Sequence, residues 1–126
     1  MDCCGPILLV DDNADANEAL SLLLQLHGYR VRSAFNGQEA LRYLNAGFEP
    51  AIIVLDLRMP VMDGHEFLWA LSSDPRLAEF RVIVHSVDPS HQFPAAVIGR
   101  VPKGHDPSAL LDLVARACPL PGSLCP

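Results

Sequence analysis

The sequence has few charged residues, and positive charge is the scarcer sign. Nine of its 126 residues are Lys or Arg and fifteen are Asp or Glu, which gives a formal net charge of −6. This balance argues against non-specific binding to nucleic acid, which relies on a basic surface. Charged residues make up 19% of the chain and apolar residues 50%. The composition therefore excludes an intrinsically disordered chain and predicts one globular domain.

Long apolar runs and a secretory leader are also missing. No apolar stretch approaches the length that crosses a bilayer. The first residues, MDCCGP, lack a basic segment followed by an apolar core. We therefore expect a cytoplasmic protein without a membrane partner.

Cysteine occurs only near the two ends of the chain, at Cys3, Cys4, Cys118 and Cys125. Adjacent cysteines do not have the spacing of zinc ligands, and in the cytoplasm we expect reduced thiols. The alternative is a redox link between Cys118 and Cys3 or Cys4. It requires the last helix to run antiparallel to the first strand.

Five short segments have the pattern of β-strands. Four are apolar runs, typical of strands buried on both faces, and one alternates as an edge strand does. In chain order they are Ile7–Val10, Arg30–Ala34, Ala51–Leu55, Phe80–His85 and Val97–Val101. Helical patterns occupy residues 16–27, 36–47, 63–73 and 106–118. This alternation predicts an α/β fold with a doubly wound parallel sheet and right-handed crossovers.

Capping residues support three of these helices. Asn36 precedes Glu39 by three residues, and Asp63 precedes Glu66 in the same way. In such pairs both side chains bond to backbone N–H groups at the start of a helix. Asp106-Pro107 combines a cap with proline at the first helical position.

The segment from Val87 to Pro102 departs from the alternation. Only ten residues separate Ser86 from the next apolar run, and Pro89 and Pro94 lie among them. A crossover with its helix needs at least about 10–12 residues, and proline disrupts a helix interior. We therefore expect the fourth helix to be short or missing, and Gly99 should weaken the last strand. A domain of residues 1–118 should precede a flexible proline-rich tail of residues 119–126.

Carboxylates directly follow two of the apolar strands. Asp11 and Asp12 follow Ile7–Val10, and Asp56 follows Ala51–Leu55. If those strands are neighbours, the three acids meet at the carboxyl edge of the sheet, where such folds bind ligands. Crowded carboxylates need a cation, and an all-oxygen site suits Mg²⁺. Asp56 can then attack a phosphoryl group and form an aspartyl phosphate, whereas Asp12 could instead cap the first helix, or do so as well as bind metal.

Two further polar residues stand at the ends of strands. Ser86 offers a hydroxyl to a phosphoryl oxygen. Lys103 can pair first with Asp56 and later with a phosphoryl oxygen. On the preceding helix, we expect Phe67 and Trp69 to serve in packing and not to bind a ligand.

Together these residues resemble the receiver domain of two-component response regulators. The resemblance rests on Val10-Asp11-Asp12-Asn13, on the Asp-x-x-Met-Pro-x-Met-Asp-Gly stretch from Asp56 to Gly64, and on Asn36–Leu41, Ser86 and Lys103. It implies a flavodoxin-like five-stranded sheet of order 2-1-3-4-5 and Mg²⁺-dependent phosphotransfer to Asp56. The implied metal site consists of Asp11, Asp12, Asp56 and the backbone carbonyl of Arg58. The implied partners are a sensor histidine kinase or histidine phosphotransfer protein and a downstream protein target.

Near the end of the chain, the sequence differs from the family pattern. Gly104 follows Lys103 where the family usually has proline, and Arg100 replaces a usual aromatic residue. We expect a stand-alone receiver similar to chemotaxis regulators, a monomer or weak homodimer whose only catalysis is its own phosphorylation and dephosphorylation. The alternative is a receiver-like interaction module that works without phosphate. A metal-dependent phosphohydrolase is disfavoured, because Leu57 and Arg58 provide no second acid or base after Asp56.

Overall fold

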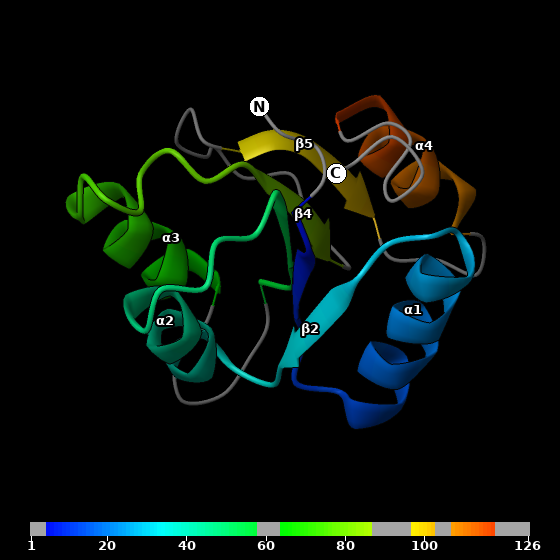
Figure 1. Cartoon of the computed structure of the whole chain (residues 1–126), viewed down its shortest axis with the longest axis horizontal. Helices are drawn as coiled ribbons and strands as arrows, with labels where there is room; N and C mark the ends of the chain where they lie inside the picture. Colours follow the sequence, from blue (N-terminus) through cyan, green and yellow to red (C-terminus); the bar gives the residue numbers. More distant parts are fainter. Residues whose placement is uncertain (1–4, 58–63, 87–96, 103–106, 118–126) are drawn as a thin grey trace.

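The protein is an α/β sandwich of three layers, with a five-stranded sheet between two pairs of helices (Figure 1). The computed structural model describes residues 5–57, 64–86, 97–102 and 107–117. Its elements are β1 (Ile7–Val10), α1 (Ala14–Leu26), β2 (Val31–Ala34), α2 (Gly37–Asn45), β3 (Ile52–Leu55), α3 (Gly64–Ser73), β4 (Val82–Ser86), β5 (Val97–Pro102) and α4 (Ser108–Ala117). All neighbouring strands are parallel, in the order β2-β1-β3-β4-β5. The predicted fold class and strand order are confirmed.

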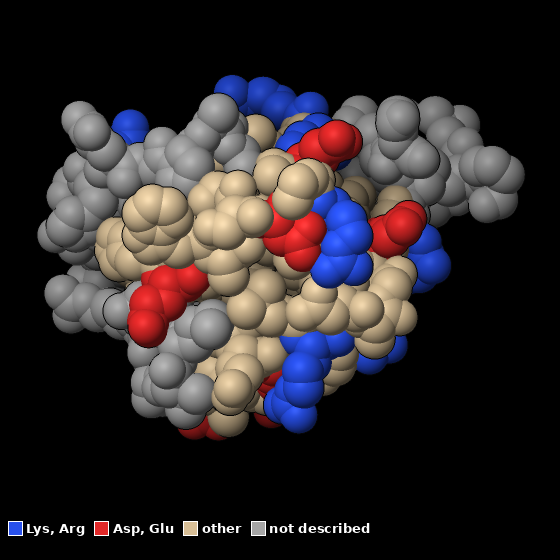
Figure 2. All heavy atoms as spheres, turned by 90° about the vertical axis from the view of Figure 1, so that its left-hand side faces the viewer, with Lys and Arg blue, Asp and Glu red and all other residues tan. Residues whose placement is uncertain are grey.

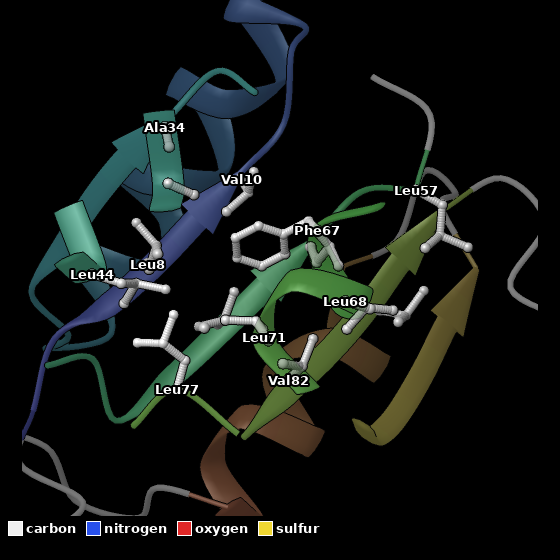
Figure 3. Packing of buried hydrophobic residues seen from close by; sticks show 14 residues of the cluster. Leu8, Val10, Ala34, Leu44, Leu57, Phe67, Leu68, Leu71, Leu77 and Val82 are labelled. Carbon is white, nitrogen blue, oxygen red and sulfur yellow. The ribbon is translucent and has the colours of Figure 1, made fainter. Parts of the chain in front are cut away.

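The two central strands are buried on both faces, as their apolar sequences predict. Every residue of β1 and β3 is at most 1% exposed. Alternate residues pack into two separate cores: Leu8 and Val10 face α2 and α3, whereas Ile7 and Leu9 face α1 and α4. Figure 3 shows the first core, with Phe67 reaching from α3 toward the strands. Since both faces are covered, β1 and β3 are fixed side by side.

The ends of α1 and α2 are defined by caps and by glycine. The N-cap of α1 is Asn13, whose side chain accepts the Ala16 N–H at 3.1 Å. The alternative in which Asp12 caps this helix is therefore wrong, because Asp12 lies one residue too early. At α2 the predicted cap is confirmed, with Asn36 accepting the Glu39 N–H at 2.8 Å. Gly28 follows α1 in the left-handed region, with φ 95°, as expected for a helix terminator.

Gly99 permits the close approach of α4 to β5. A Cβ atom on Gly99 would overlap Leu113 Cδ2. The register of β4 and β5 shifts at the same place, because Val82 pairs with Val97 and Ile83 with Gly99. A glycine that weakens a strand by propensity thus meets a packing requirement here.

The prediction that Trp69 serves in packing is contradicted by its exposure. Its side chain is 72% exposed, whereas Phe67 on the same helix is fully buried. The buried stripe of α3 consists of Gly64, Phe67, Leu68 and Leu71. Position 69 points away from this stripe at helical spacing.

The end of α4 returns to the amino-terminal edge of the sheet, as the redox alternative requires. One guanidinium group connects the two regions, since Arg81 donates to the Ala117 carbonyl at 3.0 Å and to the Ala51 carbonyl at 3.4 Å. All four cysteines lie outside the described residues, so the redox link stays a prediction. The same holds for Val87–Ala96 with its expected short helix, for the caps at Asp63 and Asp106, and for the tail 119–126. Among the described helices, none is long and apolar enough to cross a membrane.

Candidate functional site

The two central strands bring Asp11 and Asp56 to the same level of the carboxyl edge. Val10 pairs with Leu55, and an aspartate follows each of these two residues. The two aspartates therefore leave neighbouring strands at the same level. Backbone hydrogen bonds continue past the strands: the Asp56 N–H donates to the Val10 carbonyl at 2.9 Å, and the Asp11 N–H donates to the Ala34 carbonyl at 3.1 Å. The backbones of both acids are therefore as well fixed as the sheet itself.

Asp11, Asp12 and Asp56 form one acidic cluster. Each offers a carboxylate oxygen, and the three oxygens lie within 4.8 Å of one another. Asp11 and Asp56 are only 3% and 6% exposed, whereas Asp12 is exposed. The predicted convergence of the three acids is thus present. A hard divalent cation such as Mg²⁺ fits this donor set, because it prefers oxygen ligands and keeps several waters, for which the exposed side at Asp12 leaves room.

Asp11 is held by groups at the start of α1. Its Oδ1 accepts the Asn13 N–H at 3.0 Å. Its backbone carbonyl accepts a hydrogen bond from Asn17 Nδ2 at 3.0 Å, and the same nitrogen donates to the Ala34 carbonyl at 3.1 Å. Sequence reasoning did not single out Asn17. Its spacing of seven residues from Leu24 places the two on one face of α1, which the structure buries.

Gly64 draws the start of α3 close to the end of β3. Its N–H donates to the Leu57 carbonyl at 2.9 Å. A Cβ atom at this position would lie 2.6 Å from Leu57 Cα and 2.9 Å from the Asp56 carbonyl oxygen. The glycine of the Asp-Gly pair is therefore required by the backbone that carries Asp56.

Ser86 is the last residue of β4 and is almost completely buried. β4 is the neighbour of β3, with Leu55 paired to Val84, so Ser86 also lies at the carboxyl edge. The β5 residue that pairs with Ser86 is Pro102, which comes directly before Lys103. Lys103 and Arg58 lie outside the described residues, and the roles predicted for them stay predictions.

The comparison with protein families agrees with this geometry. Residues 7–114 match the family model of the response regulator receiver domain. The chain belongs to the response regulator receiver family. It thus has the acidic pocket of Asp11, Asp12 and Asp56 within a receiver domain of two-component signalling.

Relatives of this receiver domain differ in the share of their length that the chain matches. It is 45% identical over 62 residues to a CpxR homolog of Haemophilus influenzae, a match covering 49% of this chain and 26% of that protein. It is 33% identical over 91 residues to the chemotaxis protein CheV3 of Helicobacter pylori, covering 65% and 29%. The chain thus spans less than a third of these two relatives. With the two-component response regulator ORR12 of Oryza sativa, 32% identical over 82 residues, the match covers 65% of this chain and 68% of the relative.

Solved structures show the same fold. The response regulator TrrA of Thermotoga maritima, in complex with Mg²⁺-BeF, has a TM-score of 0.79 and 26% identity, covering 90% of this chain and 98% of that one. The chemotaxis protein CheY4 of Vibrio cholerae has a TM-score of 0.73 and 29% identity, covering 90% and 98%.

Proposed function

We propose that this receiver domain takes a phosphoryl group onto Asp56 from a phosphohistidine of a sensor histidine kinase or a histidine phosphotransfer protein. The observation that carries the proposal is the approach of three carboxylate oxygens to within 4.8 Å at the carboxyl edge of the sheet. Like charges at this spacing repel each other, so a structure that holds them together is suited to a cation. The bound cation in turn makes the site suitable for an anionic substrate.

Asp56 is the best placed of the three acids to be the phosphoryl acceptor. It follows the strand in the middle of the sheet, and its neighbours in space are Asp11 and Asp12 on one side and the end of β4, with Ser86, on the other. In the proposed step, an Asp56 carboxylate oxygen forms a bond to phosphorus while the phosphorus–nitrogen bond to the donor imidazole breaks. The freed imidazole keeps the electron pair of that bond, and hydrolysis later returns the carboxylate and inorganic phosphate. This reaction on itself is the only catalysis that we propose.

Asp11, Asp12 and Asp56 would hold Mg²⁺, with the Arg58 backbone carbonyl as a further oxygen ligand. The bound ion would neutralise the carboxylates and the charge of the incoming phosphoryl oxygens. The structural similarity to TrrA, a receiver solved with Mg²⁺-BeF, supports this assignment. Ser86 would donate its hydroxyl to one phosphoryl oxygen, and the ammonium of Lys103 would pair with another.

The signal would leave the domain through changed binding to a downstream protein. A reaction confined to one aspartate produces no released signal molecule, so the acyl phosphate must act by altering contacts at the protein surface. On the face formed by α2 and α3, acidic and basic side chains are interspersed (Figure 2). We propose a protein target in the cytoplasm, without nucleic acid or membrane.

Phosphorylation by acetyl phosphate tests the proposal. Intact-protein mass spectrometry should show addition of one phosphoryl group in the presence of Mg²⁺ and none with EDTA. Asp56→Asn should abolish the addition. Asp15→Asn is the matched control, because Asp15 is an exposed acid in the first turn of α1 and outside the acidic cluster.

Two results would contradict the proposal. One is equal phosphorylation of the wild type and Asp56→Asn, which would place the acceptor elsewhere. The other is a wild-type chain that binds neither Mg²⁺ nor beryllofluoride, which would favour the alternative of a receiver-like module that works without phosphate.

A further inference from the structure

Asn17 is a buried polar side chain whose orientation is fixed by two backbone carbonyls. It is 1% exposed, and its Nδ2 donates to the carbonyls of Asp11 and Ala34. The reversed amide would set Oδ1 against two carbonyl oxygens, so the NH₂ group must face them. Among the described residues, Oδ1 itself has no hydrogen-bond partner. A buried oxygen without a donor costs stability, and what offsets this cost is the pair of hydrogen bonds made by Nδ2.

These two hydrogen bonds join three elements at the acidic cluster. The Asp11 N–H donates to the Ala34 carbonyl at the end of β2. The Asp11 carbonyl accepts a hydrogen bond from the Asn17 side-chain amide on α1. The peptide groups on both sides of Asp11 Cα are thereby held. Because Asn13 N–H also holds the Asp11 carboxylate, rotation of this residue is restricted at both backbone and side chain.

We infer that Asn17 is a positioning residue for the acidic cluster and sets its Mg²⁺ affinity without touching the ion. This inference rests on the proposed function, since it presumes that Asp11 is a metal ligand. Groups that hydrogen-bond to a metal ligand, without touching the metal, typically change metal affinity by about 10–100-fold when they are removed. In Asn17→Ala, the Asp11 carbonyl loses its side-chain donor, and the Asp11 backbone can move away from Asp56.

The test compares Mg²⁺ binding by calorimetry in the wild type, Asn17→Ala and a control, Leu24→Ala. Leu24 is fully buried on the same helix but packs in the core between the sheet and α1 and α4. Its truncation should destabilise the fold while leaving the acidic cluster intact. We expect at least about tenfold weaker Mg²⁺ binding in Asn17→Ala and unchanged binding in Leu24→Ala.

A second measurement uses the metal-free protein. Amide hydrogen exchange at Asp11 N–H should become faster in Asn17→Ala, because Asn17 no longer holds the Asp11 and Ala34 carbonyls together, and Ala34 is the acceptor of that N–H. Leu24→Ala should not change the rate at Asp11 relative to neighbouring strand residues. If Asn17→Ala does not fold, Asn17→Ser supplies one hydroxyl donor in place of the amide. An intermediate loss of Mg²⁺ affinity is then expected.

The outcomes separate this inference from the function on which it rests. Unchanged Mg²⁺ affinity in the Asn17 variant, with normal binding by the wild type, would overturn the inference alone. Equal losses in the Asn17 and Leu24 variants would also overturn it, since a general loss of stability would then be sufficient. A wild type that binds no Mg²⁺ would overturn both the inference and the proposed function.

Discussion

Replacing Gly64 by alanine should damage the fold and the acidic cluster together. The added Cβ would lie 2.6 Å from Leu57 Cα, 2.8 Å from Leu57 Cδ2 and 2.9 Å from the Asp56 carbonyl oxygen. Two of these three atoms belong to the backbone, so a side-chain rotation cannot relieve the clash. Either α3 moves outward or the end of β3 shifts.

The expected cost follows from two opposing effects. Overpacking typically costs about 1–3 kcal/mol, and the fixed backbone around Asp56 places Gly64→Ala toward the upper end. Alanine favours a helix over glycine by about 1 kcal/mol, but less at the first residue of α3. We therefore expect a net loss of about 2 kcal/mol in the free energy of unfolding. Because the clash includes the Asp56 carbonyl, Mg²⁺ affinity should fall as well.

Urea denaturation followed by circular dichroism measures the stability, and calorimetry measures the Mg²⁺ affinity. Gly47→Ala is the matched control. At Gly47 a Cβ meets nothing within 4 Å, but φ is 103°, so alanine there should cost about 1 kcal/mol through backbone strain alone. It should leave Mg²⁺ binding unchanged. If Gly64→Ala is as stable as the wild type and binds Mg²⁺ equally well, the argument from close approach is wrong.

The remaining predictions concern α3 and the loop after it. Phe67→Ala should cost about 3–5 kcal/mol by urea denaturation, because the ring is fully buried. Trp69→Ala, with 72% of the side chain exposed, should stay within about 0.5 kcal/mol of the wild type, and a larger loss would mean that Trp69 packs against the domain. The hydrogen bond from Arg76 lowers the pKa of the Asp74 carboxyl below its ordinary value. This ion pair should therefore stabilise the fold above the unfolded-state pKa of Asp74, and its contribution should disappear as the pH falls through the folded-state pKa. NMR titration should show the lowered pKa in the wild type and a return toward the ordinary value in Arg76→Ala.

The strands were predictable because burial on both faces leaves a simple pattern, whereas their order came from the resemblance to receiver domains. Ile7–Val10 and Ile52–Leu55 contain no polar residue, and each is followed by an acid. Such runs are typical of parallel strands that helices cover on both faces. The acidic cluster was predictable once these strands were placed side by side. The structure pairs Val10 with Leu55, so Asp11 and Asp56, which follow them, lie close together.

Other features depend on geometry that a residue pattern does not contain. Asp12 and Asn13 are both good N-cap residues, and only the path of the chain out of β1 decides that Asn13 accepts the Ala16 N–H. Trp69 was expected to pack because aromatic side chains carry a large apolar area, yet its angular position on α3 lies outside the buried stripe. Asn17 was missed because a polar residue in a helix is usually solvated, whereas here it bonds to two carbonyls that come from separate strand ends.

The acidic cluster and the two cores are parts of one energetic arrangement. Bringing Asp11, Asp12 and Asp56 together is unfavourable without a cation. The opposing term comes from β1 and β3, which are buried on both faces and cannot separate without exposing both cores. The sheet therefore holds the carboxylates close together, and a cation that binds there relieves repulsion instead of having to gather its ligands. The buried strands thus determine where the carboxylates of the acidic cluster meet.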